Sequence, residues 1–173
     1  MKRFIILASI ILLCTLVAQV SAEAKTTLKI GTDVPNIILT DLSGGEFDLS
    51  KKLGTKTIVL TFFTTWSKTC NEELAFFSAL KKEYKNENLE IITISLDRTT
   101  KDLEKFIKDN NYDFTFLPNK KLKYLADYRV LIIPTVFLIN PDGTLQNIYV
   151  DYDKNVEKAL SEDLKKIFKK ASS

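Results

Sequence analysis

The sequence predicts an α/β fold in a single domain, and three observations lead to that expectation. Residues 57–63 and 90–96 are short runs of β-branched, aliphatic and aromatic residues, which is typical of strands buried on both faces of a sheet. Between them, apolar residues recur at three- and four-residue steps, as in a helix with one buried face, and a strand, a crossover helix and a strand form a parallel pair. The length of 173 residues, with 45% hydrophobic and 27% charged residues, suits one globular domain with a sizeable core.

The first 22 residues are predicted to be an export signal. Met1-Lys2-Arg3 is a basic start, residues 4–17 are mostly apolar, and residues 20–22 (Val-Ser-Ala) are the small residues that a signal peptidase needs. We therefore expect a signal peptide over residues 1–22, a mature domain over residues 23–173 and a location outside the cytoplasm, in the bacterial periplasm or at the cell surface. A retained anchor is the alternative, because the apolar stretch nearly reaches the roughly 20 residues that span a bilayer; only then is a membrane partner expected.

Composition excludes several kinds of site. The chain has no histidine, which removes Ser-His-Asp and Cys-His catalysis and every His-ligated metal or haem site. The net charge is +3, and it falls to +1 when Lys2 and Arg3 leave with the signal, so no nucleic-acid partner is expected. The lysines of residues 165–170 alternate with apolar residues at helical spacing, which is typical of a solvated helix face. No metal and no other cofactor is expected.

The order of elements begins with a hairpin. Residues 36–41 and 46–49 flank Ser43-Gly44-Gly45, a turn signal with glycine available for positive φ. Residues 57–63 follow as the central strand. Ser67 is then the expected N-cap of a helix, with Glu72 and Glu73 in its first turns, where carboxylates suit the helix dipole. The residues on the inward face of this helix are Cys70, Leu74, Phe77, Leu80 and Tyr84.

The remaining elements alternate in the same way. They are a strand at 90–96, a helix with Leu103, Phe106 and Ile107 inward that ends at 110–111, a strand at 114–117, a short helix at 120–128 carrying Leu122 and Leu125, a strand at 135–139, its hairpin partner at 145–150, and a helix at 155–170.

Cysteine usage is unusual for an exported chain. Of two cysteines, Cys14 leaves with the signal, so Cys70 is the only cysteine of the mature domain and no internal disulfide can form. Cys70 is therefore a structural thiol, a single reactive thiol or the remnant of a pair.

The residues around Cys70 resemble a known family. Phe62-Phe63-Thr64-Thr65-Trp66 followed by Ser67-Lys68-Thr69-Cys70 resembles the "F-W-A-T-W-C-x-x-C" segment of thioredoxin-fold proteins, and Glu73 matches a glutamate of the TlpA/ResA-like branch of extracytoplasmic thiol-disulfide oxidoreductases. Residues 31–35 and 130–143 resemble that branch's lead-in and its "v-x-G-I-P-T-x-F-L-I-D-x-x-G" segment. The resemblance implies a thioredoxin-like three-layer sandwich, with the TlpA-type insertion within the 63 residues between Cys70 and Pro134.

The resemblance also implies the roles of the site residues. Ser67 occupies the position of the nucleophilic cysteine and Cys70 that of the resolving cysteine. Trp66 would cover the site, Lys68 and Thr69 complete the motif, Pro134 would be cis, and the backbone of Ile133 would pair with an extended peptide. From the residues alone other interpretations stay open: Cys70 as an inert buried thiol, Glu73 as an exposed helix-start carboxylate, Trp66 as a core residue and Pro134 as a trans proline.

The leading functional prediction is thus an exported TlpA/ResA-type protein with a degenerate motif. A serine hydroxyl neither ionises near neutral pH nor forms a disulfide, so the two-thiol cycle cannot run, whether Ser67 is natural or engineered. The expected partner is an extracytoplasmic thiol or disulfide protein or peptide. Glu73 lies on the inward stripe, so its carboxyl is expected to be partly desolvated, to have a raised pKa and to exchange a proton with a nearby thiol.

Two alternatives remain. One is a peroxiredoxin-like thiol peroxidase using Cys70, because Ser67-Lys68-Thr69-Cys70 also resembles that family's Thr/Ser-x-x-Cys. Against it, that family's proline seven residues before the cysteine is Phe63 here, and its arginine falls at Pro134. The other is a non-catalytic module that binds peptide or protein in the cleft and does not need Cys70.

Overall fold

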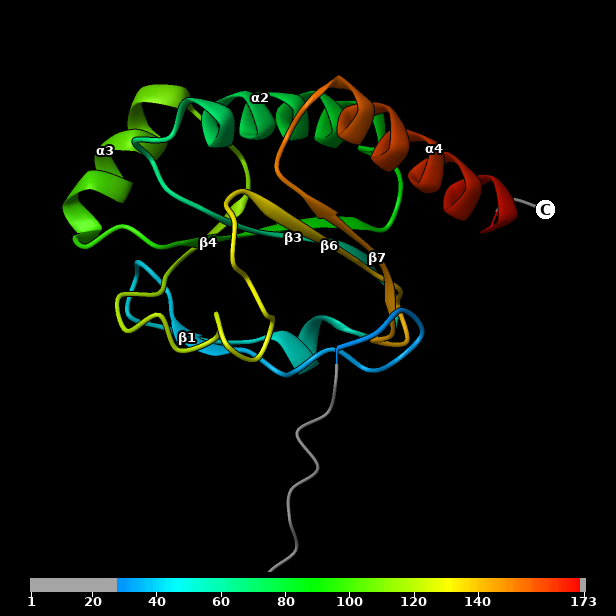
Figure 1. The fold of residues 1–173 in the computed structure, drawn as a ribbon, viewed down its shortest axis with the longest axis horizontal. Coiled ribbons are helices and arrows are strands. Elements are labelled where there is room, and N and C mark those ends of the chain that lie inside the picture. The colour runs from blue at the N-terminus through cyan, green and yellow to red at the C-terminus, as the bar shows by residue number, and fades with distance from the viewer. Residues whose placement is uncertain (1–27, 172–173) are drawn as a thin grey trace, which may run out of the picture.

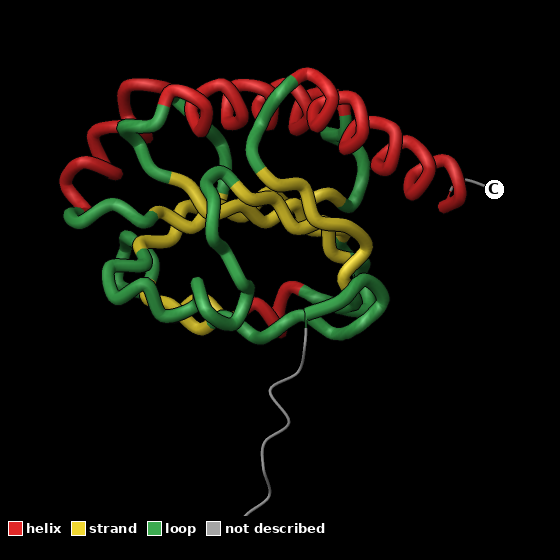
Figure 2. The backbone as a smooth tube through the Cα atoms, viewed as in Figure 1, coloured by secondary structure: helices red, strands yellow, loops and turns green. Residues whose placement is uncertain are grey.

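A computed structural model describes residues 28–171. The signal peptide expected over residues 1–22 lies outside the described residues, as does the start of the domain expected from residue 23. Within residues 28–171, no helix is long and apolar enough to cross a membrane. The described chain forms three layers: helices on one face of a central sheet, the sheet itself, and a hairpin with loops on the other face (Figures 1 and 2).

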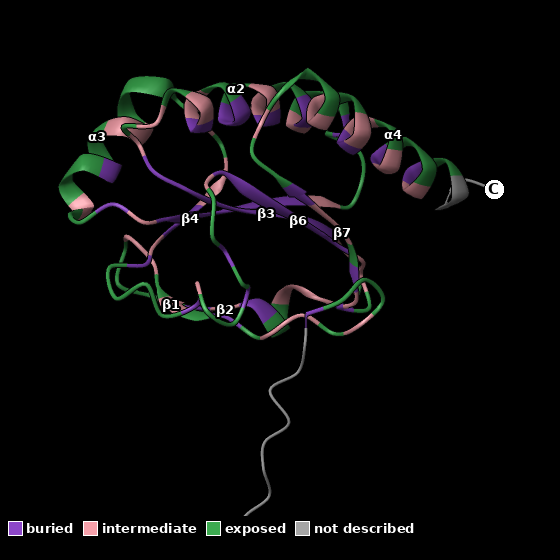
Figure 3. Cartoon of the chain, in the orientation of Figure 1, coloured by how far each residue is buried: buried purple, intermediate pink, exposed green. Residues whose placement is uncertain are grey.

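The central sheet has five strands in the order β5-β4-β3-β6-β7. Their bounds are β3 Thr57–Phe63, β4 Leu89–Ser95, β5 Thr115–Pro118, β6 Thr135–Ile139 and β7 Leu145–Val150. β3 pairs in parallel with β4, as β4 does with β5, whereas β6 is antiparallel to both β3 and β7. The prediction of a central strand is confirmed, because every residue of β3 is buried (Figure 3).

Side chains of β3 alternate between two hydrophobic clusters, one on each face of the sheet. Val59 and Phe63 pack on the side of the helices, whereas Ile58, Leu60 and Phe62 pack toward the hairpin. Thr61 shares the helix-facing side with Val59 and Phe63. This polar residue in the middle of an apolar strand therefore faces the helices.

The helices are α2 (Lys68–Glu83), α3 (Thr100–Asn110) and α4 (Lys154–Ala171), and each contributes buried residues to the same cluster. Their inward residues agree with the predicted stripes and include Leu74 and Phe77 of α2, Leu103 of α3, and Leu160 and Leu164 of α4. Lys165 and Lys166 are exposed on α4, as expected for a solvated face.

The opposite face of the sheet is covered by the predicted hairpin and by the segment before β6. The hairpin consists of β1 (Ile38–Thr40) and β2 (Glu46–Asp48) in antiparallel register, and the 3₁₀ helix η2 (Leu49–Lys52) follows it. Phe47 and Leu49 pack from here into the cluster that contains Phe62.

The helix predicted over residues 120–128 is wrong: this segment is a series of turns. Leu122 has a positive φ of 51°, which a helix does not allow, and its side chain is 47% exposed. Two tyrosines are buried in its place. Tyr124 exchanges hydrogen bonds with the backbone of Ile38, and the Tyr128 hydroxyl donates to Pro35 O at 2.6 Å. These long-range bonds hold the segment against the hairpin, which overrides its helical spacing.

Candidate active site

The motif lies at the junction of β3 and α2, at the carboxyl edge of the parallel strands. Ser67 is the N-cap of α2 as predicted, and its Oγ accepts a hydrogen bond from the Cys70 N–H at 3.3 Å. This bond satisfies one of the donors that a helix N-terminus leaves free. The Ser67 side chain therefore serves the helix backbone at the position where the related motif carries a thiol.

Cys70 is completely buried in the first turn of α2 and is a free thiol. Burial raises the pKa of the Cys70 thiol above its ordinary value, and polar groups of Ser67 and Thr64 offset only part of that rise. The attacking species in thiol exchange is the thiolate. The burial of Cys70 therefore favours the protonated thiol over the thiolate.

Glu73 lies one turn further along α2 and is also completely buried. Its Oε2 accepts a hydrogen bond from Thr61 Oγ1 at 2.7 Å, whereas its Oε1 has no hydrogen-bond partner. Burial raises the pKa of Glu73 to about 8, the Thr61 hydrogen bond lowers it, and the negative charge of Asp151 raises it. The interpretation of Glu73 as an exposed carboxylate is wrong, and the predicted desolvation is confirmed.

The loop before the motif is held by two side chains that the sequence analysis did not identify. Asp97, which follows β4, accepts hydrogen bonds from the Thr65 N–H at 3.2 Å and from the Thr65 hydroxyl at 2.9 Å. Asn71 donates to the Thr65 carbonyl at 3.2 Å. The available signal was the position of Asp97, because the carboxyl ends of neighbouring parallel strands meet at one edge of the sheet.

The other motif residues face solvent to different degrees. Trp66 is 76% exposed, so its interpretation as a core residue is wrong. Lys68 is exposed and forms an ion pair with Glu72 at 3.6 Å, and Thr69 is half-buried. None of these three adds a hydrogen bond to Cys70 or Glu73 within the described residues.

The segment that leads into β6 completes the site. The Ile133–Pro134 peptide bond is cis, and Pro134 is buried. Because Thr135 pairs with Phe62, Pro134 lies beside the end of β3, where the motif begins. Ile133 is partly buried, and within residues 28–171 its backbone groups form no hydrogen bond. The preceding Leu131 is 95% exposed, which leaves an apolar side chain on the same loop in solvent.

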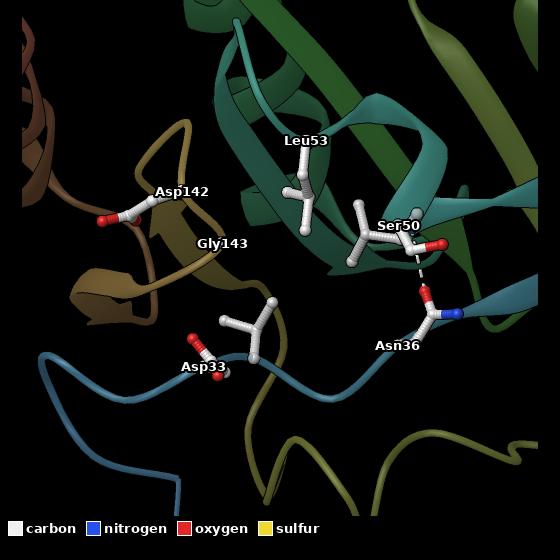
Figure 4. A pocket seen from close by; sticks show the side chains of 8 residues that line it. Asp33, Asn36, Ser50, Leu53, Asp142 and Gly143 are labelled. Atoms are coloured by element: carbon white, nitrogen blue, oxygen red, sulfur yellow. Dashed lines mark hydrogen bonds between the residues drawn. The ribbon is translucent and has the colours of Figure 1, made fainter.

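A pocket of about 280 Å³ lies at the far end of the sheet from this site, where β6 turns into β7 (Figure 4). Two of its polar side chains are used locally: Asn36 accepts from the Ser50 N–H, and Asp142 accepts from Thr144. No group of three His, Cys, Asp or Glu side chains that could hold a metal ion occurs in the described part of the chain.

Comparison with known proteins agrees with this arrangement. Residues 30–148 match the AhpC/TSA family. A thiol-disulfide oxidoreductase ResA of Bacillus cereus is 34% identical over 141 residues, which cover 82% of this chain and 75% of the relative. ResA of Bacillus subtilis is 28% identical over 142 residues, covering 80% of this chain and 79% of the relative.

Solved structures give the same fold. A Chlorobium tepidum protein assigned as the thiol:disulfide interchange protein DsbE has a TM-score of 0.75 and 25% identity, and the match covers 80% of this chain and 96% of that chain. StoA from Bacillus subtilis has a TM-score of 0.61 and 22% identity, covering 74% of this chain and 95% of that chain. With the family match and the ResA relatives, the chain belongs to the AhpC/TSA family of thioredoxin-fold proteins, and within it to the TlpA/ResA-like thiol-disulfide oxidoreductases.

Proposed function

We propose that the chain is an exported thiol-disulfide exchange protein that forms one mixed disulfide with its partner through Cys70. The observation that carries this proposal is the position of Ser67, whose Oγ caps α2 at 3.3 Å from the Cys70 nitrogen. A hydroxyl at this position cannot attack a disulfide, and Cys70 is the only cysteine within residues 28–171.

The proposed reaction is a single exchange. The Cys70 thiolate attacks one sulfur of the partner's disulfide, the Cys70–partner S–S bond forms as the partner's own S–S bond breaks, and the second partner sulfur leaves as a thiolate. Cys70 is oxidised and the leaving sulfur is reduced. The Cys70 proton passes to Glu73 in its ionised form, which is the minor form at pH 7 because the pKa of Glu73 is about 8. Glu73 lies on the same helix face one turn away. Because Ser67 cannot resolve the product, only an external thiol releases the partner.

Burial makes this exchange selective. The thiolate of Cys70 is disfavoured by burial, and an ionised Glu73 adds a like charge that raises the pKa of Cys70 further. A partner that docks and reorganises the site will react, whereas small disulfides in solution will react slowly. A slow, partner-dependent exchange is therefore what these surroundings favour.

The proposed partner is an extended segment of an extracytoplasmic protein or peptide that carries a thiol or disulfide. The backbone of Ile133, which has no hydrogen-bond partner in the described part of the chain, offers strand-like hydrogen bonds to such a segment. The exposed Trp66, Leu131 and Ile132 offer apolar contact beside it. The names of the ResA relatives and the export signal expected over residues 1–22 support a redox partner outside the cytoplasm.

The peroxidase alternative has less support. Peroxide reduction needs a stabilised thiolate with access to solvent, whereas Cys70 is completely buried and its pKa is raised. The non-catalytic module differs from the proposal in a single respect, the requirement for Cys70.

The test is the mass of the reduced domain, residues 23–173, after incubation with glutathione disulfide as a stand-in for the partner. We expect one glutathione adduct, formed slowly, and no adduct on Cys70→Ser protein. Absence of an adduct on folded wild-type protein after prolonged incubation would favour the non-catalytic module. Rapid consumption of hydrogen peroxide that depends on Cys70 would favour the peroxidase.

A further inference from the structure

The hydroxyl of Thr61 contacts two parts of the site at once. Its Oγ1 lies 2.7 Å from Glu73 Oε2 and 3.3 Å from the backbone carbonyl oxygen of Thr135. Glu73 is on α2, Thr61 is in the middle of β3, and Thr135 is the first residue of β6, directly after Pro134. All three residues are buried, so these two contacts lie inside the protein and not at its surface.

A threonine hydroxyl carries one proton, which can be donated in only one of these two directions at a time. When Glu73 is ionised, the carboxylate is an acceptor only, and Thr61 donates to it. When Glu73 is protonated, its hydroxyl can donate to Thr61 Oγ1, and the Thr61 proton is then free for the Thr135 carbonyl. This second arrangement also gives an acceptor to a carboxyl proton that would otherwise be buried without one, which is unfavourable.

Other charged and titratable groups face Glu73, but none of those in the described part of the chain forms a hydrogen bond with its carboxyl. Asp151, in the loop between β7 and α4, acts on Glu73 through its charge. The Tyr152 hydroxyl donates to Glu157 at 2.7 Å, and Cys70 shares the helix of Glu73. Among the described residues, Thr61 is the hydrogen-bond partner of the Glu73 carboxyl.

We propose that Thr61 is a positioning residue that reverses its hydrogen bond with the protonation of Glu73, and so transmits that protonation to the backbone that follows Pro134. This inference rests on the proposed function, in which Glu73 takes the proton of Cys70. Each proton transfer would then tighten the contact between β3 and the start of β6, and each proton loss would loosen it. The backbone that follows Pro134 and the Cys70 thiol would then both depend on the protonation state of Glu73.

The test measures two carbon signals by NMR as a function of pH in the full chain: the side-chain carboxyl carbon of Glu73 and the backbone carbonyl carbon of Thr135. Thr61→Val removes the hydroxyl and keeps the shape, and Thr61→Ser keeps the hydroxyl. Thr93→Val is the matched control, because Thr93 pairs with Thr61 in the sheet and donates to a different carbonyl, that of Thr115, at 3.0 Å.

In wild-type protein and in the Thr61→Ser and Thr93→Val variants, we expect the Thr135 carbonyl signal to titrate with the midpoint of Glu73, near pH 8. In Thr61→Val, the Glu73 midpoint moves to higher pH and the Thr135 step is lost. A Thr135 signal that does not titrate in wild-type protein, or that titrates equally in Thr61→Val, would overturn the relay while leaving the proposed exchange at Cys70 intact. If Glu73 itself does not titrate, the relay and the proton-accepting role of Glu73 both fail. The single-adduct experiment on Cys70 tests the exchange separately.

Discussion

Replacing Glu73 by glutamine should stabilise the protein increasingly as pH rises. The ordinary pKa of this carboxyl is 4.5, and burial raises it to about 8 in the folded protein. Below pH 4.5 the carboxyl is protonated in both the folded and the unfolded protein. The burial of Glu73 then carries no cost of ionisation, and the stability that its protonated form provides is fully retained. Between the two values the unfolded chain releases a proton that the folded protein keeps, so stability falls with rising pH. Glutamine has the same shape and does not ionise, so this loss disappears.

The magnitude follows from the two pKa values. Each pH unit between them costs the wild-type protein about 1.4 kcal/mol. The accumulated cost is about 3 kcal/mol at pH 7 and about 5 kcal/mol above pH 8. Oε1 of Glu73 already lacks a partner, so the glutamine amide should add a nearly constant difference that does not depend on pH. The slope of the difference in unfolding free energy is therefore the diagnostic quantity.

The assay is urea unfolding followed by circular dichroism at pH 5, 6, 7 and 8. We expect the difference in unfolding free energy between Glu73→Gln and wild type to grow by about 1.4 kcal/mol per pH unit up to pH 7 and by less between pH 7 and 8, where Glu73 of the folded protein begins to ionise. Glu72→Gln is the matched control, since the Glu72 side chain is 55% exposed beside Lys68, and its difference should stay nearly constant. A difference for Glu73→Gln that does not change with pH, or an equal slope for Glu72→Gln, would refute the argument that burial controls this carboxyl.

Three further outcomes are expected. Ser67→Ala removes the cap of α2 and should lower the unfolding free energy by about 1 kcal/mol, whereas Ser67→Asn, which can also cap, should lower it less; urea unfolding measures both. Tyr128→Phe keeps the ring but removes the bond to Pro35 O, and the same assay should show a loss of about 1 kcal/mol. In Ser67→Cys protein, Glu73→Gln should slow thiol exchange and change its pH–rate profile. An unchanged profile would leave Glu73 without its proposed role.

The sequence predicted the elements whose local pattern and tertiary packing agree. The run at residues 57–63 is buried on both faces because it lies at the centre of the sheet, and the stripe that starts at Cys70 faces that sheet. The same stripe predicted that Glu73 is desolvated, since its spacing places it among apolar residues. The segment 120–128 could not be predicted in this way, because distant backbone groups of Pro35 and Ile38 fix its tyrosines.

The site residues that are close together in the sequence could be predicted, whereas those that strand pairing brings together could not. Ser67, Cys70 and Glu73 share one helix, so their relation follows from helical spacing. Thr61 is a hydroxyl residue within a largely apolar strand, and its role follows only from the contacts that α2 and β6 make with it. Asp97 is likewise 32 residues from Thr65 in the chain and reaches it through the pairing of β3 with β4.

The central claim is that Ser67 interrupts a site whose other parts are in place. Insulin reduction by dithiothreitol tests it most directly, with wild-type and Ser67→Cys protein compared at equal concentration. We expect wild-type protein to leave the uncatalysed rate unchanged, because one thiol forms a mixed disulfide that it cannot resolve, and we expect Ser67→Cys to accelerate the reaction. Turnover by the wild-type protein above the uncatalysed rate, or no acceleration by folded Ser67→Cys protein, would contradict the account.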